Sequence, residues 1–181
     1  MLKTLMTIGA LAGVLSASSM ARGQALPTAT AAGNLQVGAG YTYAKPDYGT
    51  ESIKGASAFL DFDFRPHIGI EATYHYIALV TPTDLGEDSF LAGPRFILPY
   101  GRFSVYAKAL AGVGDLVIQE QQDNVGRQSG SFFAYAIGGG VDIRATSHLI
   151  IRAIDVESQH WNYQTGLTPF VLTVGAAYRF R

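Results

Sequence analysis

Apolar and polar residues alternate one by one over much of the chain after residue 33. In residues 56–65, one set of alternate positions is apolar, whereas the other set carries Asp61 and Asp63. Successive side chains of a β-strand point to opposite sides of the sheet. The stretch therefore predicts a strand with one apolar and one polar face, and both acids lie on the polar face.

The same alternation recurs in eight long segments, and the connections between them alternate in length. Strands of globular proteins typically have about 5–6 residues, whereas a tilted transmembrane strand needs about 9–11. Segments of about 11 to 17 residues, joined alternately by short turns (RPH, PYG and ATS) and longer polar loops, predict an up-and-down meander. The predicted strands are residues 34–44, 54–65, 67–81, 88–98, 102–118, 131–144, 148–159 and 169–180.

Two local features add expectations about the barrel wall. Pro94 lies inside the fourth predicted strand but has no N–H group for the ladder, so with Gly93 before it we expect a β-bulge. The segment HWNYQTGLT holds the only tryptophan, Trp161. Because aromatic side chains gather at membrane interfaces, we expect this residue to rest at the lipid boundary.

The first 25 residues have the composition of a secretory signal peptide. Lys3 gives a basic start, an apolar run follows at residues 5–15, and small residues allow cleavage after Ala21 or Ala25. The apolar run is about half of the ~20 residues that a membrane-spanning helix needs. We therefore expect a signal peptide at residues 1–25, a lead-in linker at 26–33 and a β-barrel domain at 34–181.

The alternation alone fits two kinds of barrel. A water-soluble, lipocalin-like barrel buries its apolar face, whereas an outer-membrane barrel turns that face toward lipid. The polar faces here are rich in small residues, the chain has four lysines, and aromatics cluster near strand ends on the apolar faces. These features favour an all-β, eight-stranded antiparallel up-and-down transmembrane β-barrel. Its narrow lumen would be filled by side chains.

Charged residues at similar heights on the polar faces predict a network inside this lumen. Asp61 and Glu71 fall almost opposite each other across the RPH turn, an arrangement that is repulsive unless cations lie nearby. The following strands supply three cations at a similar level. The predicted lumen charge network is Asp61, Glu71, Arg95, Lys108 and Arg152.

Composition excludes several kinds of chemistry. A net charge of −1 gives no electrostatic basis for binding nucleic acid. The absence of cysteine excludes disulfides and thiolate metal sites. The four histidines are scattered without metal-ligand spacing, and His160 near Ser158 and Glu157 is a weak catalytic signal because neighbouring strand residues alternate faces. We expect no enzyme activity, no cofactor and no metal site.

Several segments resemble the small outer-membrane β-barrel family that includes the OmpA transmembrane domain and OmpX. They are NLQVGAGYTY, AGPRF, YAKALAGVG, AIGGGVDIRATSHLIIRAIDVE and AAYRF. The resemblance implies a Gram-negative-type outer membrane, contact with its lipids and lipopolysaccharide, and insertion by the outer-membrane assembly machinery. It also implies a monomer with the short turns on the periplasmic side.

The expected function is that of a non-enzymatic outer-membrane barrel with a charge-plugged lumen and a structural or surface-interaction role. Two alternatives stay open. Some eight-stranded barrels are lipid-modifying enzymes, and inward glycines such as Gly138 and Gly140 could leave room for a narrow solute pore. The other reading of these glycines is close strand packing and curvature.

Overall fold

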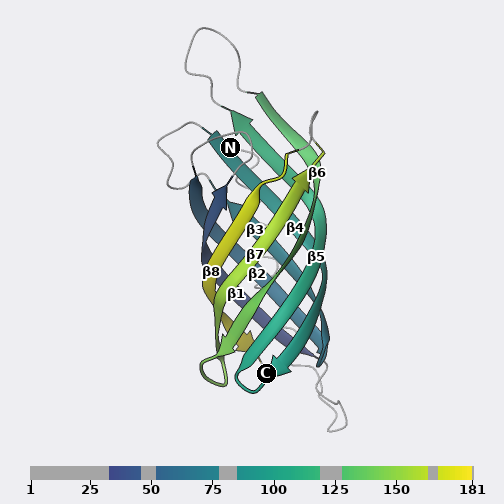
Figure 1. The fold of residues 1–181 in the computed structure, drawn as a ribbon, viewed down its shortest axis with the longest axis vertical. Coiled ribbons are helices and arrows are strands. Elements are labelled where there is room, and N and C mark those ends of the chain that lie inside the picture. The colour runs from purple at the N-terminus through teal and green to yellow at the C-terminus, as the bar shows by residue number, and fades with distance from the viewer. Residues whose placement is uncertain (1–32, 46–51, 78–84, 119–127, 163–166, 181) are drawn as a thin grey trace, which may run out of the picture. The chain divides into compact units, whose positions relative to one another are not determined.

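The computed structural model describes residues 33–45, 52–77, 85–118, 128–162 and 167–180, except the side chains of residues 85–87, 116–118 and 128–129. They form eight antiparallel strands in one closed barrel (Figure 1). No helix in these ranges is long and apolar enough to cross a membrane. The strands are β1 (Asn34–Lys45), β2 (Ile53–Arg65), β3 (Ile68–Tyr76), β4 (Leu85–Tyr100), β5 (Phe103–Ile118), β6 (Gln128–Arg144), β7 (Leu149–Trp161) and β8 (Phe170–Phe180).

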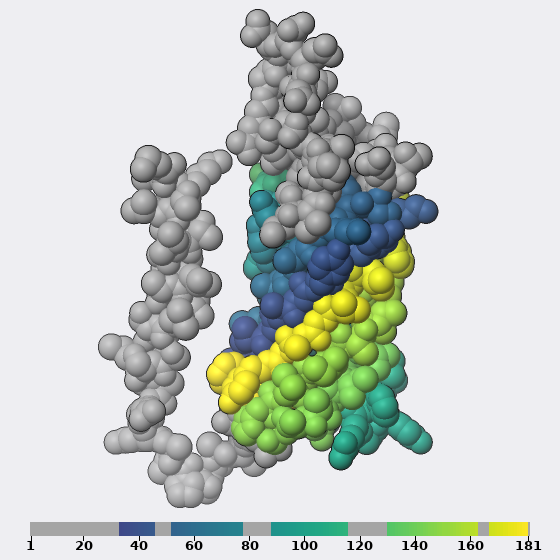
Figure 2. Space-filling view, turned by 90° about the vertical axis from the view of Figure 1, so that its left-hand side faces the viewer, coloured from purple at the N-terminus to yellow at the C-terminus, as the bar shows by residue number. Residues whose placement is uncertain are grey.

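Each strand pairs with its neighbour in sequence, and β8 returns to pair with β1. Figure 2 shows β8 lying diagonally beside β1, in the register that places Gly40 opposite Gly175. Closure satisfies the backbone N–H and C=O groups of both edge strands, which lipid cannot do. The predicted eight-stranded up-and-down barrel is confirmed. The predicted signal peptide and residues 26–32 of the linker lie outside the described residues.

The outer surface is apolar and the interior is polar. Leu98 and Ile137 are each 68% exposed, whereas Asp61 and Glu71 are at most 1% exposed. A water-soluble barrel has the opposite distribution, because its apolar side chains must leave water. This inversion excludes the lipocalin-like alternative.

Pro94 causes no bulge. β4 pairs with β3 in one continuous register through Pro94, and its pairing with β5 stops at Ala92 and resumes at Arg95 without a shift. The hydrogen-bond ladder between β4 and β5 therefore skips Gly93 and Pro94, so it needs no N–H group from the proline. The expectation of a bulge at Gly93 and Pro94 was wrong.

The register shifts lie elsewhere, in the half of the barrel that ends in the short turns. One of them separates Arg152 from Asp155 in the pairing of β7 with β8. Both of these side chains are buried, while Ala153 and Ile154 between them are exposed. A bulge of this kind re-aims the residues that follow it. After Ile154, the odd-numbered residues of β7 face the lumen.

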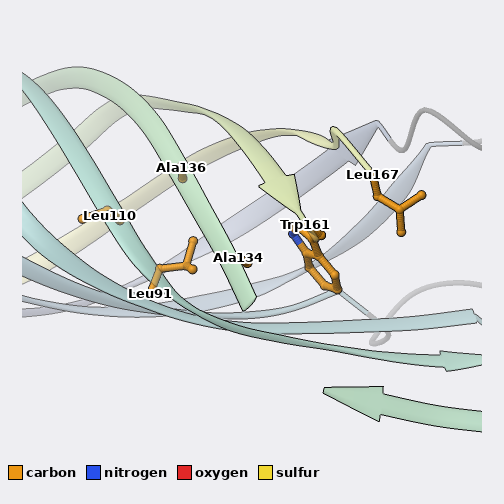
Figure 3. Close-up of a cluster of buried hydrophobic side chains, with 6 residues drawn as sticks. All are labelled: Leu91, Leu110, Ala134, Ala136, Trp161 and Leu167. Carbon is orange, nitrogen blue, oxygen red and sulfur yellow. The ribbon is translucent and has the colours of Figure 1, made fainter. Parts of the chain in front are cut away.

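The half of the lumen away from the short turns holds an apolar cluster (Figure 3). Trp161 belongs to it and is 1% exposed, so the expectation that it rests at the lipid boundary was wrong. Its indole Nε1–H donates to Gln159 Oε1 at 3.0 Å, which satisfies the one polar group of the ring. The cluster consists of Leu91, Leu110, Ala134, Ala136, Trp161 and Leu167.

Gly114 makes room for this indole. A Cβ at Gly114 would lie 2.7–2.8 Å from the Trp161 ring atoms. We expect Gly114→Ala to lower the free energy of unfolding by about 1–3 kcal/mol through overpacking. Urea unfolding of the refolded barrel, followed by the fluorescence of this single tryptophan, measures the loss.

The matched control is Ala107→Val, on the exposed face of the same strand, which should change stability by no more than about 0.5 kcal/mol. In a Trp161→Leu background, followed by circular dichroism, Gly114→Ala should cost much less. An equal cost in both backgrounds would show that the indole is not the obstacle.

Candidate functional site

Charged side chains from six neighbouring strands, β2 to β7, meet inside the barrel. Each of them is at most 5% exposed. Isolated charges are not tolerated at such burial, so partners are required. The cluster, called here the lumen network, consists of Asp61, Glu71, Arg95, Lys108, Asp142, Arg152, Asp155 and Glu157.

The structure brings all five sequence-predicted residues into this network. Arg95 Nη1 lies 2.6 Å from Asp61 Oδ2, and Arg95 Nε lies 3.7 Å from Glu71 Oε2. Arg152 contacts the same two acids, with Nη2 donating to Asp61 Oδ2 at 2.8 Å and Nη1 to Glu71 Oε1 at 3.2 Å. The mutual repulsion of two acids on adjacent strands is thus offset by two shared guanidinium groups.

Lys108 lies at the centre of a second group of acids. Its ammonium is 2.6 Å from Glu71 Oε1 and 2.7 Å from both Asp155 Oδ2 and Glu157 Oε1. These three carboxylates can bring oxygen atoms within 4.8 Å of one another, which is a spacing that suits a metal ion. The lysine ammonium contacts all three, so a cation of the chain itself already occupies the position between them.

Sequence reasoning missed three acids of the network. Asp142 sits on the same face as Gly138 and Gly140, so alternation along β6 could have found it. Asp155 and Glu157 could not be found by alternation from Arg152, because the bulge in β7 reverses the parity. The missed signal was that strict alternation would place both carboxylates in lipid, at high cost.

Aromatic rings pack against the guanidinium groups of the two arginines of the lumen network, Arg95 and Arg152. The guanidinium carbon of Arg95 lies 4.0 Å from the centre of the Tyr106 ring, and that of Arg152 lies 3.7 Å from the centre of the Phe59 ring. The Tyr106 hydroxyl also donates a hydrogen bond to Asp155 Oδ2. Cation–π contacts are stronger when both partners are buried, as these residues are.

A polar layer joins the lumen network to the apolar cluster. Glu157 contacts His75 Nε2 at 3.3 Å and accepts a hydrogen bond from Gln159 Nε2 at 3.0 Å. Gln159 in turn accepts the indole N–H of Trp161. The lumen is therefore occupied by charged, polar and apolar side chains in succession.

The histidines do not form an accessible catalytic site in the described part of the chain. Thr73, His75 and Glu157 lie within reach of one another, but each is at most 3% exposed, so a substrate could not approach them. Ser147 Oγ lies 2.8 Å from His148 Nδ1 in an exposed short turn. No carboxylate in the described residues contacts that histidine, so the orienting acid of a triad is missing.

Solved outer-membrane barrels share this fold. The attachment invasion locus protein Ail of Yersinia pestis is 20% identical, with a TM-score of 0.57 over 82% of this chain and 99% of that one. OprG of Pseudomonas aeruginosa is 13% identical, with a TM-score of 0.55 over 83% and 97%. Neisserial surface protein A is 15% identical, with a TM-score of 0.54 over 82% and 96%. Identities this low establish the fold alone.

Among curated protein sequences, none gives a significant match to this chain. The family model for the outer membrane protein beta-barrel domain matches residues 7–180. The model spans nearly the whole sequence, and the inverted barrel agrees with it in architecture. The resemblance to small outer-membrane barrels is confirmed, and the cell outer membrane is the site of the protein. The chain belongs to the outer membrane protein beta-barrel domain family.

Proposed function

We propose that this outer-membrane protein is a closed, non-enzymatic barrel that acts through its outer surface, in a structural or surface-interaction role. The observation that carries the proposal is the lumen network, which fills the barrel with paired charges from six strands. Moving a solute through this level would require breaking several buried ion pairs, and each broken pair costs several kcal/mol. A narrow pore is therefore disfavoured.

The same packing disfavours an enzyme that modifies lipids. A nucleophile and its base must lie within reach of a substrate at the barrel rim. In the described residues, the histidine that contacts an acid, His75, is 1% exposed. The exposed pair of Ser147 and His148 lies in a short turn, which we expect on the periplasmic side, away from the outer rim.

The composition of the longer connections indicates the chemistry of a surface partner. Residues 46–51, 78–84, 119–127 and 163–166 carry five acids and one base, Arg127. The Ail barrel has been solved with the heparin analogue sucrose octasulfate, which is a polyanion. A negatively charged outer surface would repel such a ligand and attract a basic partner. The five acids are Asp47, Glu51, Asp84, Glu120 and Asp123.

Contact with membrane lipid follows from the apolar outer face. We further propose a monomer whose aromatic residues rest in lipid and lipopolysaccharide, placed there by the outer-membrane assembly machinery. Exposed tyrosines on β1 and β3 lie toward the longer connections, and they are Tyr41, Tyr43, Tyr74 and Tyr76. Such side chains combine an apolar ring with a polar tip that suits the headgroup level.

Two measurements test the closed, non-enzymatic barrel. In planar lipid bilayers, the purified protein should give no steady ion conductance, because the lumen is filled. Mass spectra of lipid A from cells with and without the protein should be identical. A stable open channel would overturn the closed lumen, and a new lipid A species would overturn the non-enzymatic assignment.

The partner class is tested with proteoliposomes passed over polylysine and heparin surfaces. We expect retention on polylysine that weakens as salt rises from 50 to about 300 mM, because exposed charges are screened. The control variant replaces all five loop acids by their amides and should lose this retention. Preferential retention on heparin would contradict the proposed chemistry of the partner.

A further inference from the structure

The buried charges of the lumen do not balance. Among the described residues, five buried carboxylates face three buried basic side chains, so two negative charges are in excess when His75 is neutral. Asp63 lies beside them, half-buried, and adds a further carboxylate, whereas half-buried Arg179, opposite Gln36 on β8, adds a further cation. An uncompensated charge in such surroundings is costly. A cation bound near these acids, or protons on them, would offset this excess.

Three buried oxygen atoms near the short-turn end have no hydrogen-bond partner among the residues that the structure describes. They are Asp61 Oδ1, Asp63 Oδ1 and Gln36 Oε1. Asp61 uses only Oδ2 toward Arg95 and Arg152, and Asp63 accepts the amide of Gln36 at its Oδ2, at 3.1 Å. Each residue thus has one side-chain oxygen that accepts no hydrogen bond from the described residues. Gln36 is nevertheless only 7% exposed, and Asp61 is not exposed at all.

The register places these three residues together. Gln36 on β1 is directly opposite Asp61 on β2, and Asp63 is two residues further along the same face of β2. Across β2, the partner of Asp63 is Gly69, where a Cβ would lie 2.5 Å from Asp63 Oδ1. The glycine therefore leaves space for the unpartnered oxygen. The partial exposure of Asp63 opens the position to water at the short-turn end.

We propose that Gln36, Asp61 and Asp63 bind a calcium ion at the short-turn end of the lumen. Two carboxylates and an amide carbonyl are the oxygen ligands that hard cations prefer, and calcium tolerates an irregular set completed by water. The ion supplies two positive charges beside a network that has two negative charges in excess. The proposal is independent of the surface function, because it concerns the opposite end of the barrel.

The affinity of this site is set by opposing charges. Arg95 and Arg152 already neutralise part of Asp61, so they weaken the attraction for a second cation. With three protein ligands and neighbouring arginines, we expect dissociation constants of roughly 10⁻⁴–10⁻³ M, as in extracellular calcium modules. Magnesium should bind more weakly, because it demands a regular octahedron and gives up its water reluctantly.

The experiment uses the full chain refolded in lipid vesicles without lipopolysaccharide, stripped with EDTA, and returned to calcium or to sodium of equal ionic strength. Radioactive calcium in equilibrium dialysis should show one ion per chain. The urea midpoint, followed by Trp161 fluorescence, should rise with calcium but not with sodium. Magnesium should give a smaller rise.

Two matched variants locate the effect. Asp63→Asn keeps the shape of a half-buried residue and should abolish both the bound ion and the calcium-dependent rise in midpoint. Asp115→Asn removes an exposed acid on the outer face of β5 and should leave both unchanged. The proposal is overturned if calcium binds equally well to Asp63→Asn. It is also overturned if calcium does not change the urea midpoint of the wild type and Asp63→Asn is more stable than the wild type. Protons or water would then fill the position.

Discussion

Replacing Arg152 by alanine is expected to lower the free energy of unfolding by about 3–5 kcal/mol, the usual cost of leaving buried charges without their partner. The guanidinium also loses its contact with the Phe59 ring. Packing around it cannot compensate, because the lumen is closed by the strands on every side. The ion-pair partners of Arg152 are Asp61, Glu71, Asp142 and Asp155.

The measurement is urea unfolding in lipid vesicles, with Arg102→Ala as the control. Arg102 is exposed in a short turn and should change stability by no more than about 0.5 kcal/mol. Adding Asp61→Asn to Arg152→Ala should recover part of the loss, because it removes one of the carboxylates that the remaining cations no longer balance. A neutral Arg152→Ala, or strictly additive losses in the double mutant, would show that the network does not stabilise the barrel.

Most of the fold could be predicted from the sequence, because the membrane imposes period-two alternation on every strand. A strand in this wall has lipid on one side and a packed lumen on the other. Asp61, Glu71 and Lys108 were placed inside by this rule alone, and they lie there. Counting residues from the nearest short turn then predicted that charged residues of different strands lie at one level of the lumen.

The rule fails where the strand is irregular. In β7, the bulge after Arg152 turns Asp155 and Glu157 inward, and both are essential partners of Lys108. Counting residues cannot locate a bulge. The physical chemistry of the side chains can, because a strand with two carboxylates on its lipid face is too costly to exist.

Trp161 illustrates a second limit. An aromatic residue near a strand end can lie either at the lipid interface or inside a lumen that has space for it. Here the space comes from Gly114 on β5, a strand that is not adjacent to β7. No local sequence pattern around Trp161 reveals the space that Gly114 provides, because Gly114 lies 47 positions earlier in the chain. Such pairings are visible only in the folded barrel.

The lumen network has a consequence for strand pairing. Sliding one strand by a single residue would exchange its lipid and lumen faces, because side chains alternate. For β3, the slip would carry Glu71 into lipid and Ile70 into the charged cluster. Buried charges therefore penalise wrong registers more severely than an apolar lumen would. We infer that the network contributes to the choice of register as well as to stability.

Lys108→Met, as a separate single substitution, should lower the free energy of unfolding by about 3–5 kcal/mol, the range for removing one partner of a buried ion pair. Methionine keeps the length of the side chain but leaves Glu71, Asp155 and Glu157 facing one another. Their oxygens can lie within 4.8 Å of one another, so the variant exposes a set of metal ligands that the ammonium occupies in the native chain.

We therefore expect the stability of Lys108→Met to depend strongly on divalent cations. Refolded in lipid vesicles with EDTA, it should show the full loss in urea unfolding, and refolding with 10 mM calcium or magnesium should recover part of it. The comparison is made in an Asp63→Asn background, which removes the proposed calcium site at the short-turn end, with Ala107→Val in the same background as the control. Recovery that equals the response of this control would show that the three carboxylates do not hold an ion, and that Lys108 does more than balance their charge.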